Sequence, residues 1–364
     1  GRSVTLAGFS SDGKRLLTVA KGAPADPAWA HVWSLDTATK LQSFRHDGII
    51  RAARFHPDGQ QVATACDDFQ ARVWNVDDGQ LTGQVMPHGS SVLRVYWIDE
   101  ETLATVARDG SFSRWDVTSG QRLEPSYDAA ATPIFSDIDP TGHWAAIAAN
   151  DGFVHAFWMR WGHTIGCLIP CGETATALAI HPDGRNLIAA SEGGVIKAWD
   201  LAGVTTREIE LPHRQAVQQV HFSPDGDRVI STSEDGTARL WQTNDGSGIG
   251  AVMQHAAVIY DGKFDRTGQF VVTASIDKTC QVWDGNSGIA VGPQFRHEEP
   301  LVRVAVHPGE DRVLTADVTG SVKAWTYQSD TPDFELNHND QVNSLRYSPD
   351  GTMVATASSD KTAR

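Results

Sequence analysis

The sequence predicts an all-β fold in which a unit of four short strands is repeated along the whole chain. In the clearest unit, His213 to Trp241, apolar and polar residues alternate, and Ser-Pro-Asp-Gly and Glu-Asp-Gly turns separate three β-rich runs. Alternation of this kind between turns is typical of antiparallel strands. Units recur every 41 to 46 residues, and a period in the forties with four strands is typical of a β-propeller.

The units follow one another without interruption. The end of the first strand recurs at Phe9, Phe55, Trp97, Ile138, Ile180, Phe222, Phe264, Val306 and Tyr347. The first unit starts at its inner strand, Ser3 to Phe9, and carries a Pro- and Ala-rich insertion, Lys21 to Trp29. Such composition predicts an exposed loop, which either only connects strands or also binds a partner.

Two units in the middle of the chain depart from the pattern. The fourth carries a stretch rich in His and Trp, His155 to His163, which either fills space between two imperfect units or forms a binding patch. The fifth keeps Trp199 but has Cys171, Ala189 and Gly193 where the other units have polar residues.

The ninth unit, His338 to Arg364, stops inside its third strand. Propellers typically have four to eight blades. We therefore expect residues 1–337 to form a ring of about eight blades, with residues 338–364 as an incomplete blade or the start of a following repeat array. Rings of seven or nine units remain alternatives. The unfinished unit also leads us to expect that the chain is a fragment of a larger multidomain protein.

The repeats resemble the WD-repeat β-propeller family, in its bacterial type. The resemblance rests on a histidine before the first strand, the Ser-Pro-Asp-Gly turns, and closing tripeptides such as Arg-Leu-Trp, and it covers essentially the whole chain. It implies a hydrogen-bonded tetrad of His, Ser/Thr, Asp and Trp within each blade. Four complete sets occur: His46, Thr64, Asp68, Trp74; His88, Thr105, Asp109, Trp115; His213, Ser231, Asp235, Trp241; and His255, Thr273, Asp277, Trp283.

Other units contain the tetrad only in part. The eighth has His297, Thr315 and Trp325, with Thr319 in place of the aspartate, and the ninth has His338, Thr356 and Asp360. The tetrads contain the residue types of a catalytic triad. An active site is expected once in the chain, however, whereas these sets recur at equivalent positions. We interpret them as structural devices that satisfy buried polar groups.

Composition narrows the classes of partner. Lys and Arg number 30 against 45 Asp and Glu, a net charge of −15, which argues against nucleic acid or an anionic membrane as the main partner. Few cysteines fit a reducing compartment, so we expect a cytoplasmic protein. Cys66, Cys167, Cys171 and Cys280 lack the paired spacing of a metal site, so we expect no metal or other cofactor.

Nothing in the sequence indicates catalysis, since it has neither a phosphate-binding loop nor a nucleophile elbow. Three histidines that precede prolines, His56, His181 and His307, are expected to be exposed. We predict a non-catalytic interaction scaffold or sensor, active in signalling, that binds a protein or peptide. The alternative is a propeller enzyme with a metal or carboxylate centre in its axial channel.

The resemblance also implies where a partner would bind, namely the narrow top face of the ring. Contact positions there lie three and five residues after each ring histidine and just before each turn aspartate. We expect partner binding by Arg51, Asp67, Leu93, Arg108, Glu192, Gln218, Glu234 and Tyr260. Such a mixture of Arg, aromatic and polar residues suits a protein interface.

Overall fold

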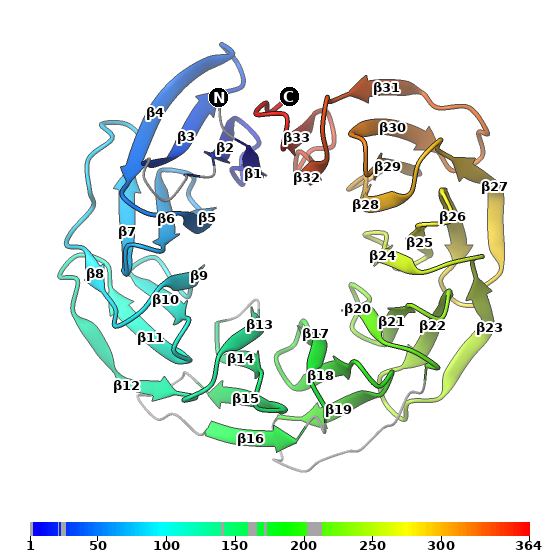
Figure 1. Ribbon diagram of the computed structural model, residues 1–364, viewed down its shortest axis with the longest axis horizontal. Helices are drawn as coiled ribbons and strands as arrows, with labels where there is room; N and C mark the ends of the chain where they lie inside the picture. The colour runs from blue at the N-terminus through cyan, green and yellow to red at the C-terminus, as the bar shows by residue number, and fades with distance from the viewer. Residues whose placement is uncertain are drawn as a thin grey trace.

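A computed structural model describes residues 3–20, 22, 27–139, 142–158, 166–170, 173–201 and 213–364. Over these residues the chain forms nine antiparallel sheets set around one axis (Figure 1). The predicted all-β class is confirmed, and so is the division into four-stranded blades. None of the described segments is a helix with the length and apolar character needed to span a bilayer.

Within each blade the strands pair in chain order, from the inner strand at the axis to the outer strand at the rim. The strands of blades one to four are β1 (Val4–Phe9), β2 (Arg15–Ala20), β3 (Ala28–Ser34), β4 (Thr39–His46), β5 (Ile50–Phe55), β6 (Gln61–Cys66), β7 (Gln70–Asn75), β8 (Met86–Pro87), β9 (Val92–Trp97), β10 (Thr102–Ala107), β11 (Ser111–Asp116), β12 (Arg122–Asp128), β13 (Pro133–Ile138), β14 (Trp144–Ala149), β15 (Phe153–Trp158) and β16 (Gly166–Pro170).

The remaining blades continue the ring. Their strands are β17 (Ala175–Ile180), β18 (Asn186–Ser191), β19 (Ile196–Asp200), β20 (Val217–Phe222), β21 (Arg228–Ser233), β22 (Thr237–Gln242), β23 (Gly248–Gln254), β24 (Ile259–Phe264), β25 (Phe270–Ser275), β26 (Thr279–Asp284), β27 (Ala290–Arg296), β28 (Leu301–Val306), β29 (Arg312–Asp317), β30 (Ser321–Thr326), β31 (Phe334–Asn337), β32 (Val342–Tyr347) and β33 (Val354–Ser358). Blade five has three described strands and blade nine has two.

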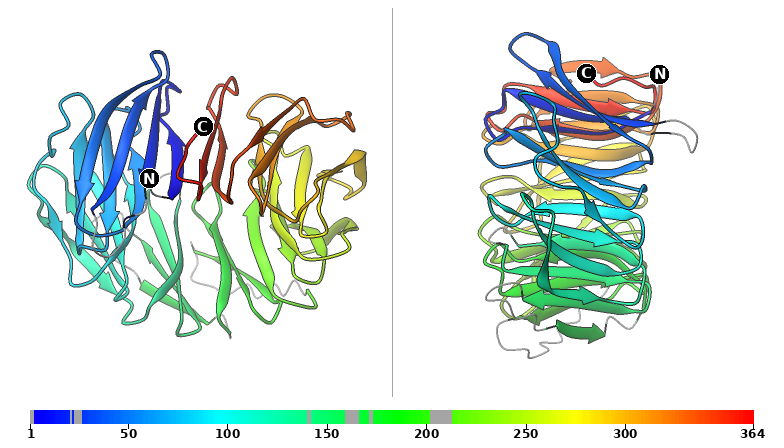
Figure 2. Two further views of the ribbon diagram at one scale, coloured as in Figure 1. Left: turned by 45° about the horizontal axis from the view of Figure 1, so that its top comes forward. Right: turned by 90° about the vertical axis from the view of Figure 1, so that its left-hand side faces the viewer.

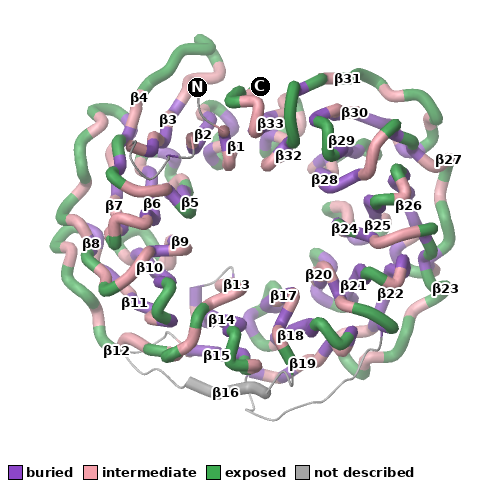
Figure 3. The backbone as a smooth tube through the Cα atoms, in the orientation of Figure 1, coloured by how far each residue is buried: buried purple, intermediate pink, exposed green. Residues whose placement is uncertain are grey.

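The hydrophobic core lies between neighbouring sheets rather than inside any one of them. One cluster joins Leu17 and Val19 of blade one to Ile50 and Val62 of blade two, and similar clusters join the other neighbours. The middle strands are almost entirely buried, and the outer strands are the most exposed (Figure 3). A blade therefore depends on its neighbours to cover both of its faces.

The ninth unit is itself a member of the ring and stands between blades eight and one. Val4, Ala7 and Leu16 of blade one share a buried cluster with Ala355 and Ala357 of β33. Polar bonds cross the same seam, because Asn343 Nδ2 donates to Val4 O at 2.9 Å and Ser344 Oγ donates to Ala7 O at 3.2 Å. Figure 2 shows the two chain ends at this seam. The last residues thus pack as an incomplete blade.

Two regions singled out in the sequence lie partly outside the described residues. These are most of the insertion from Lys21 to Trp29 and the part of the His/Trp-rich stretch that follows Trp158. Cys171 and the side chain of Cys167 lie outside as well. What the sequence predicts for these residues therefore stays a prediction.

Candidate functional site

Blades six and seven each bring a complete tetrad together. His213 Nε2 lies 2.7 Å from Ser231 Oγ, which accepts a 2.8 Å hydrogen bond from Trp241 Nε1. His213 Nδ1 lies 3.4 Å from Asp235 Oδ2. In blade seven the equivalent contacts measure 3.2 Å or less, among His255, Thr273, Asp277 and Trp283.

The electrostatics of the tetrad in blade six suit a structural tie better than a nucleophile. Burial lowers the pKa of His213 to about 4, so the ring is neutral at pH 7. Burial acts to raise the pKa of Asp235, but hydrogen bonds from Thr237 and from the Arg214 main chain lower it to about 2. Ser231 is fully buried, and its oxygen already lies within hydrogen-bond distance of both His213 Nε2 and Trp241 Nε1. A substrate would have no path to this hydroxyl.

Blade eight completes its tetrad with a residue that the sequence reading missed. Thr319 stands at the usual aspartate position, but Asp317, two residues earlier, places its Oδ2 3.1 Å from His297 Nδ1. Thr319 donates to the same carboxylate through its main-chain N–H and its hydroxyl. Asp317 ends β29 at the position held by Ser233 in blade six, and its longer side chain reaches the ring histidine. The prediction that this set lacks its carboxylate is therefore wrong.

Blades three and nine also keep the contact between the ring histidine and the strand threonine, but of these two only blade nine brings its aspartate to the histidine. In blade three, His88 Nε2 lies 2.7 Å from Thr105 Oγ1, and Trp115 donates to that oxygen at 2.9 Å. His88 Nδ1 lies 2.9 Å from Met86 O, whereas Asp109 accepts from Ser111. In blade nine the contacts are made by His338, Thr356 and Asp360.

Blade two replaces the direct tetrad contacts of His46 with an arginine. The Nη1 atom of Arg72 lies 2.9 Å from His46 Nδ1 and 2.8 Å from Asp68 Oδ2. His46 Nε2 is buried and has no hydrogen-bond partner among the described residues, although Trp74 still donates to Thr64 at 3.0 Å. The predicted residues lie together, but their histidine is bonded through Arg72 rather than to Thr64 or Asp68.

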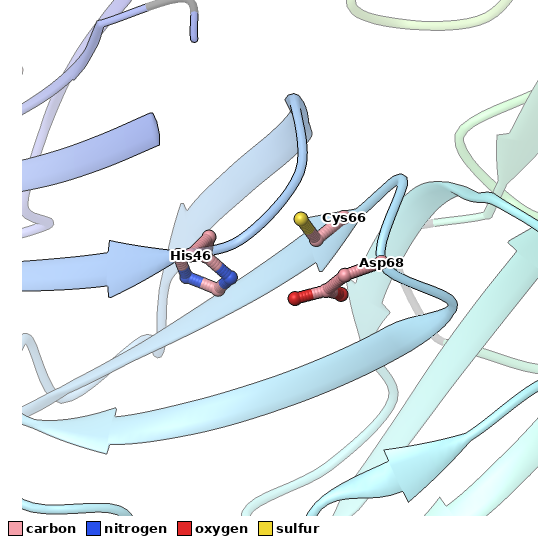
Figure 4. Close-up of side chains that lie close together, drawn as sticks. All are labelled: His46, Cys66 and Asp68. Carbon is pink, nitrogen blue, oxygen red and sulfur yellow. The ribbon is translucent and has the colours of Figure 1, made fainter. Parts of the chain in front are cut away.

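Blade two also holds the one group among the described residues whose donor atoms could suit a metal ion. Donor atoms of His46, Cys66 and Asp68 lie within 4.8 Å of one another (Figure 4). A zinc site would need the thiolate, but burial raises the pKa of Cys66 to about 12. The guanidinium of Arg72 already places a positive charge beside both His46 and Asp68. We therefore interpret Arg72 as the cation of this cluster.

The eroded fourth blade builds a polar contact of its own. His155 Nε2 lies 2.9 Å from Asp151 Oδ2, and His155 Nδ1 lies 3.1 Å from the hydroxyl of Tyr127. His155 occupies on β15 the place that Arg72 has on β7. The usual tetrad positions here hold Ala129, Ile147 and Phe157 beside that aspartate. A long side chain on the third strand thus compensates for the missing ring histidine.

The histidines before proline are buried, not exposed as predicted. His181 Nε2 lies 2.9 Å from Gly226 O of the next blade, and His307 Nε2 lies 3.1 Å from Gly351 O. Each of these two imidazoles therefore connects its own blade to a turn of the next blade. His56 is also buried, but its Nε2 has no hydrogen-bond partner within the described ranges. The neighbouring turn at Ile98 to Glu101 lacks the Pro-Asp-Gly geometry that supplies the carbonyl elsewhere.

A β-bulge recurs at the start of every inner strand. In blade seven, Ile259 pairs with Ser275 and Asp261 with Ala274, so that Tyr260 has no partner between them. The same shift leaves one residue unpaired in the other blades, including Arg51, Leu93 and Gln218. Bulges re-aim side chains. The position five residues after each ring histidine is therefore the bulge itself, which the sequence reading did not detect.

The predicted contact residues differ in character around the top face, by which we mean the face that carries the turns before the third strands. On blade two, Arg51 donates to Asp67 at 2.8 and 2.6 Å. Burial acts to raise the pKa of Asp67, but Arg51 and the neighbouring Ser91 and Arg108 lower it. Blades two and three thus share one charged cluster.

Farther round the ring the top face becomes acidic and then apolar. Glu192 of blade five is exposed, and Gln218 donates to Glu234 at 2.9 Å in blade six. In blades seven and eight, Tyr260, Ile276 and Val318 are 41%, 38% and 38% exposed. Single exposed apolar residues are common, but a group of them on one face is typical of an interaction surface.

The inner strands place few carboxylates where a channel enzyme would need them. Asp137 of β13 accepts main-chain N–H groups of Ile138 and Ile180 at 2.9 and 3.2 Å. Asp261 of β24 lies 3.0 Å from Lys263 Nζ and accepts from the Val304 N–H. Both carboxylates are already bonded to protein groups, an arrangement that does not favour a catalytic centre in the channel.

Comparison with known proteins adds independent observations. Five segments match the family model described as "WD domain, G-beta repeat", namely residues 38–75, 163–200, 206–242, 249–284 and 331–364, which together make up half of the chain. Over 165 residues the chain is 26% identical to the pre-mRNA-splicing factor cwf17 of Schizosaccharomyces pombe, covering 44% of this chain and 48% of that protein. Over 130 residues it is 30% identical to nucleoporin Nup37 of Mus musculus, covering 33% and 36%.

A solved structure covers the whole chain. The computationally designed Ika8 protein superposes with a TM-score of 0.62 at 19% identity, over 100% of this chain and 95% of that one. At this identity the likeness concerns the fold alone. The chain spans less than half the length of each of the two curated relatives.

Proposed function

Because this chain belongs to the WD-repeat family, we propose that it is a non-catalytic interaction scaffold that binds a protein or peptide on the top face of its ring. The curated relatives are named as a splicing factor and a nucleoporin rather than as enzymes. The observation that carries the proposal is the recurrent bulge, which presents Arg51, Leu93, Gln218 and Tyr260 at equivalent places of successive inner strands. A rigid ring that presents variable side chains at fixed positions is suited to recognition.

The expected anchors are Arg51, Arg108 and Tyr260, because Arg and aromatic side chains dominate interface energetics. Arg51 is held by Asp67 at 2.6 Å, so little of its rotamer freedom remains to be lost on binding. Tyr260 borders the exposed Ile276, whose main-chain N–H is bonded to Val258 O at 3.0 Å. A partner with an apolar segment for blade seven and an acidic group for blade two, on the opposite side of the channel, would match both regions.

The test begins with a photo-crosslinking residue at position 260 and, as control, one at position 334, where exposed Phe334 lies on the outer strand β31. A partner captured only from position 260 is then purified. Its affinity is measured for the Arg51→Ala/Arg108→Ala/Tyr260→Ala variant. The matched control is Arg45→Ala/Arg312→Ala/Phe334→Ala.

The top-face variant is expected to weaken binding at least tenfold and to melt like the parent, since exposed ion pairs contribute only ~0–1 kcal/mol. Full affinity in this variant would overturn the assignment of the top face and direct attention to the stretch from Trp158 to His163. Loss of affinity in the control variant alone would also overturn this assignment, and would direct attention to the outer strands.

The wider setting is part of the same proposal. The net charge of −15 argues against nucleic acid or membrane as the main partner. The proposal also places this WD-repeat protein, of the bacterial type, in the cytoplasm and gives it a signalling role. It includes further domains in the same polypeptide. Metal analysis of the purified ring separates this scaffold from the alternative of a metal-dependent channel enzyme.

A further inference from the structure

A hollow on the channel side of blade one has an unusual charge. Its volume is about 740 Å³, and among the described residues its lining contains four arginines, Arg51, Arg54, Arg94 and Arg346, but no aspartate or glutamate. In a chain with 45 acidic and 30 basic residues, a lining that contains arginines and no carboxylates runs against the overall composition. The hollow therefore has a local positive field inside a negatively charged protein.

The arginines come from three blades and surround a gap left by the fourth. Arg54 lies on β5, Arg94 on β9 and Arg346 on β32. Between β32 and β5 stands β1, where the residue equivalent to Arg54 and Arg346 is Gly8. A Cβ atom added at Gly8 would meet only Leu6 Cδ2, at 4.0 Å. The gap is thus produced by one missing side chain.

Three of the four guanidinium groups have no acidic partner among the described residues. Arg94 and Arg346 each donate to the carbonyl of the preceding residue, at 3.0 and 3.4 Å. Arg54 lies over the ring of Tyr96, 5.0 Å from its centroid. These contacts leave other N–H donors of each group without an acceptor in the part of the protein that the structure describes. Only Arg51 is paired, with Asp67.

The nearest acidic groups on the inner strands do not neutralise the hollow. Asp137 acts on Arg54 only through space, because its oxygens accept main-chain N–H groups, and burial raises its pKa. Asp261 is paired with Lys263, on the other side of the ring. Arg303 of β28 adds a further channel-side positive charge, with its Nη1 bonded to Val302 O at 2.8 Å.

We propose that this hollow, bounded by Arg54, Arg94 and Arg346 above Gly8, binds a small phosphate-bearing polyanion. Guanidinium groups match phosphate oxygens with two parallel hydrogen bonds. The three groups reach one compact hollow from different blades instead of following a line. That arrangement suits several negative charges held within one small group, whereas the single charges of an acidic peptide are spread along a chain.

The site is separate from the proposed contact surface. It lies on the inner wall, and Arg51 alone belongs to both. A bound polyanion would bridge blades nine, one, two and three, and would therefore join the seam where the two ends of the chain meet. Ligand binding is expected to stabilise the ring as well as to occupy the channel.

The experiment uses inorganic tripolyphosphate as the probe and isothermal titration calorimetry with the full chain at low ionic strength. The variants are Gly8→Glu, which adds a carboxylate to the gap without a backbone clash, and Arg54→Gln/Arg346→Gln. The controls are Arg303→Gln, in the channel but outside the hollow, and Arg266→Gln, on an exposed turn. Each control lowers the net charge by one, as Gly8→Glu does.

We expect saturable binding that weakens with added salt, and at least a tenfold loss of affinity in Gly8→Glu and in the double variant. Arg303→Gln and Arg266→Gln should bind within about twofold of the parent. Thermal melts without ligand establish that each variant is folded. If the probe does not bind, or if all four variants lose affinity equally, the proposal is overturned. Binding of a poly-glutamate peptide but not of tripolyphosphate would likewise reject the phosphate assignment.

Discussion

Replacement of Asp235 by alanine tests the structural interpretation of the tetrads most directly. The carboxylate accepts the main-chain N–H of Arg214 at 2.9 Å, the N–H of Thr237 at 2.8 Å and the Thr237 hydroxyl at 2.6 Å, and it lies 3.4 Å from His213. Its side chain is only 6% exposed, so water can replace these bonds only in part. A buried group left unsatisfied costs about 1–3 kcal/mol.

The expected effect on the free energy of unfolding is therefore a loss of about 1–3 kcal/mol. Urea unfolding followed by tryptophan fluorescence measures it, because Trp241 belongs to the same tetrad. The control is Asp36→Ala, which removes an exposed turn carboxylate and should change stability by less than about 0.5 kcal/mol. A second comparison, Ala129→Ser in the eroded fourth blade, should also have little effect. If Asp235→Ala unfolds at the same urea concentration as these controls, the interpretation is refuted.

Three further outcomes are expected. Asp317→Ala should destabilise about as much as Asp235→Ala whereas Thr319→Ala should not, and the reverse order in thermal melts would contradict the contact between Asp317 and His297. Burial lowers the pKa of His213 from 6.5 to about 4, so on acidification the unfolded chain takes up this proton before the folded chain does. The free energy of unfolding should therefore be highest above pH 6.5 and fall as the pH is lowered toward 4. A free energy of unfolding that stays constant across this range would contradict the burial of His213. Deletion of His338 to Arg364 uncovers the apolar edge of blade one and should cause self-association or loss of a cooperative melt, as sedimentation and calorimetry would show; a monomeric, sharply melting truncation would instead show that the first eight units close a ring by themselves.

Much of the fold follows from local patterns that every unit repeats. Alternation through Val217, Val220 and Phe222 marks an inner strand, and the turns after it fix where the next strand begins. The spacing from His213 to Trp241 likewise places four polar side chains in one blade, where their contacts are found. Such inferences succeed because hydrogen bonds within a blade join residues at constant sequence separation.

The predictions that failed concern contacts whose partners stand at a different separation. Asp317 reaches His297 from the end of a strand rather than from the turn. His181 is buried because it bonds to Gly226 of the next blade, 45 residues away. A pattern read within one unit contains no information about the surface that the neighbouring unit will place against it.

The sequence by itself thus determined the strand order, the repeat and the residues of most tetrads, because these depend on short-range pairing in each blade. Only the tertiary structure decided that blade nine packs against blade one, that Arg72 joins His46 to Asp68, and that Arg54, Arg94 and Arg346 line one hollow above Gly8. The curvature of the ring brings together side chains from units far apart in the chain. That curvature is the sum of small angles between packed sheets, set by the volumes of the side chains between them.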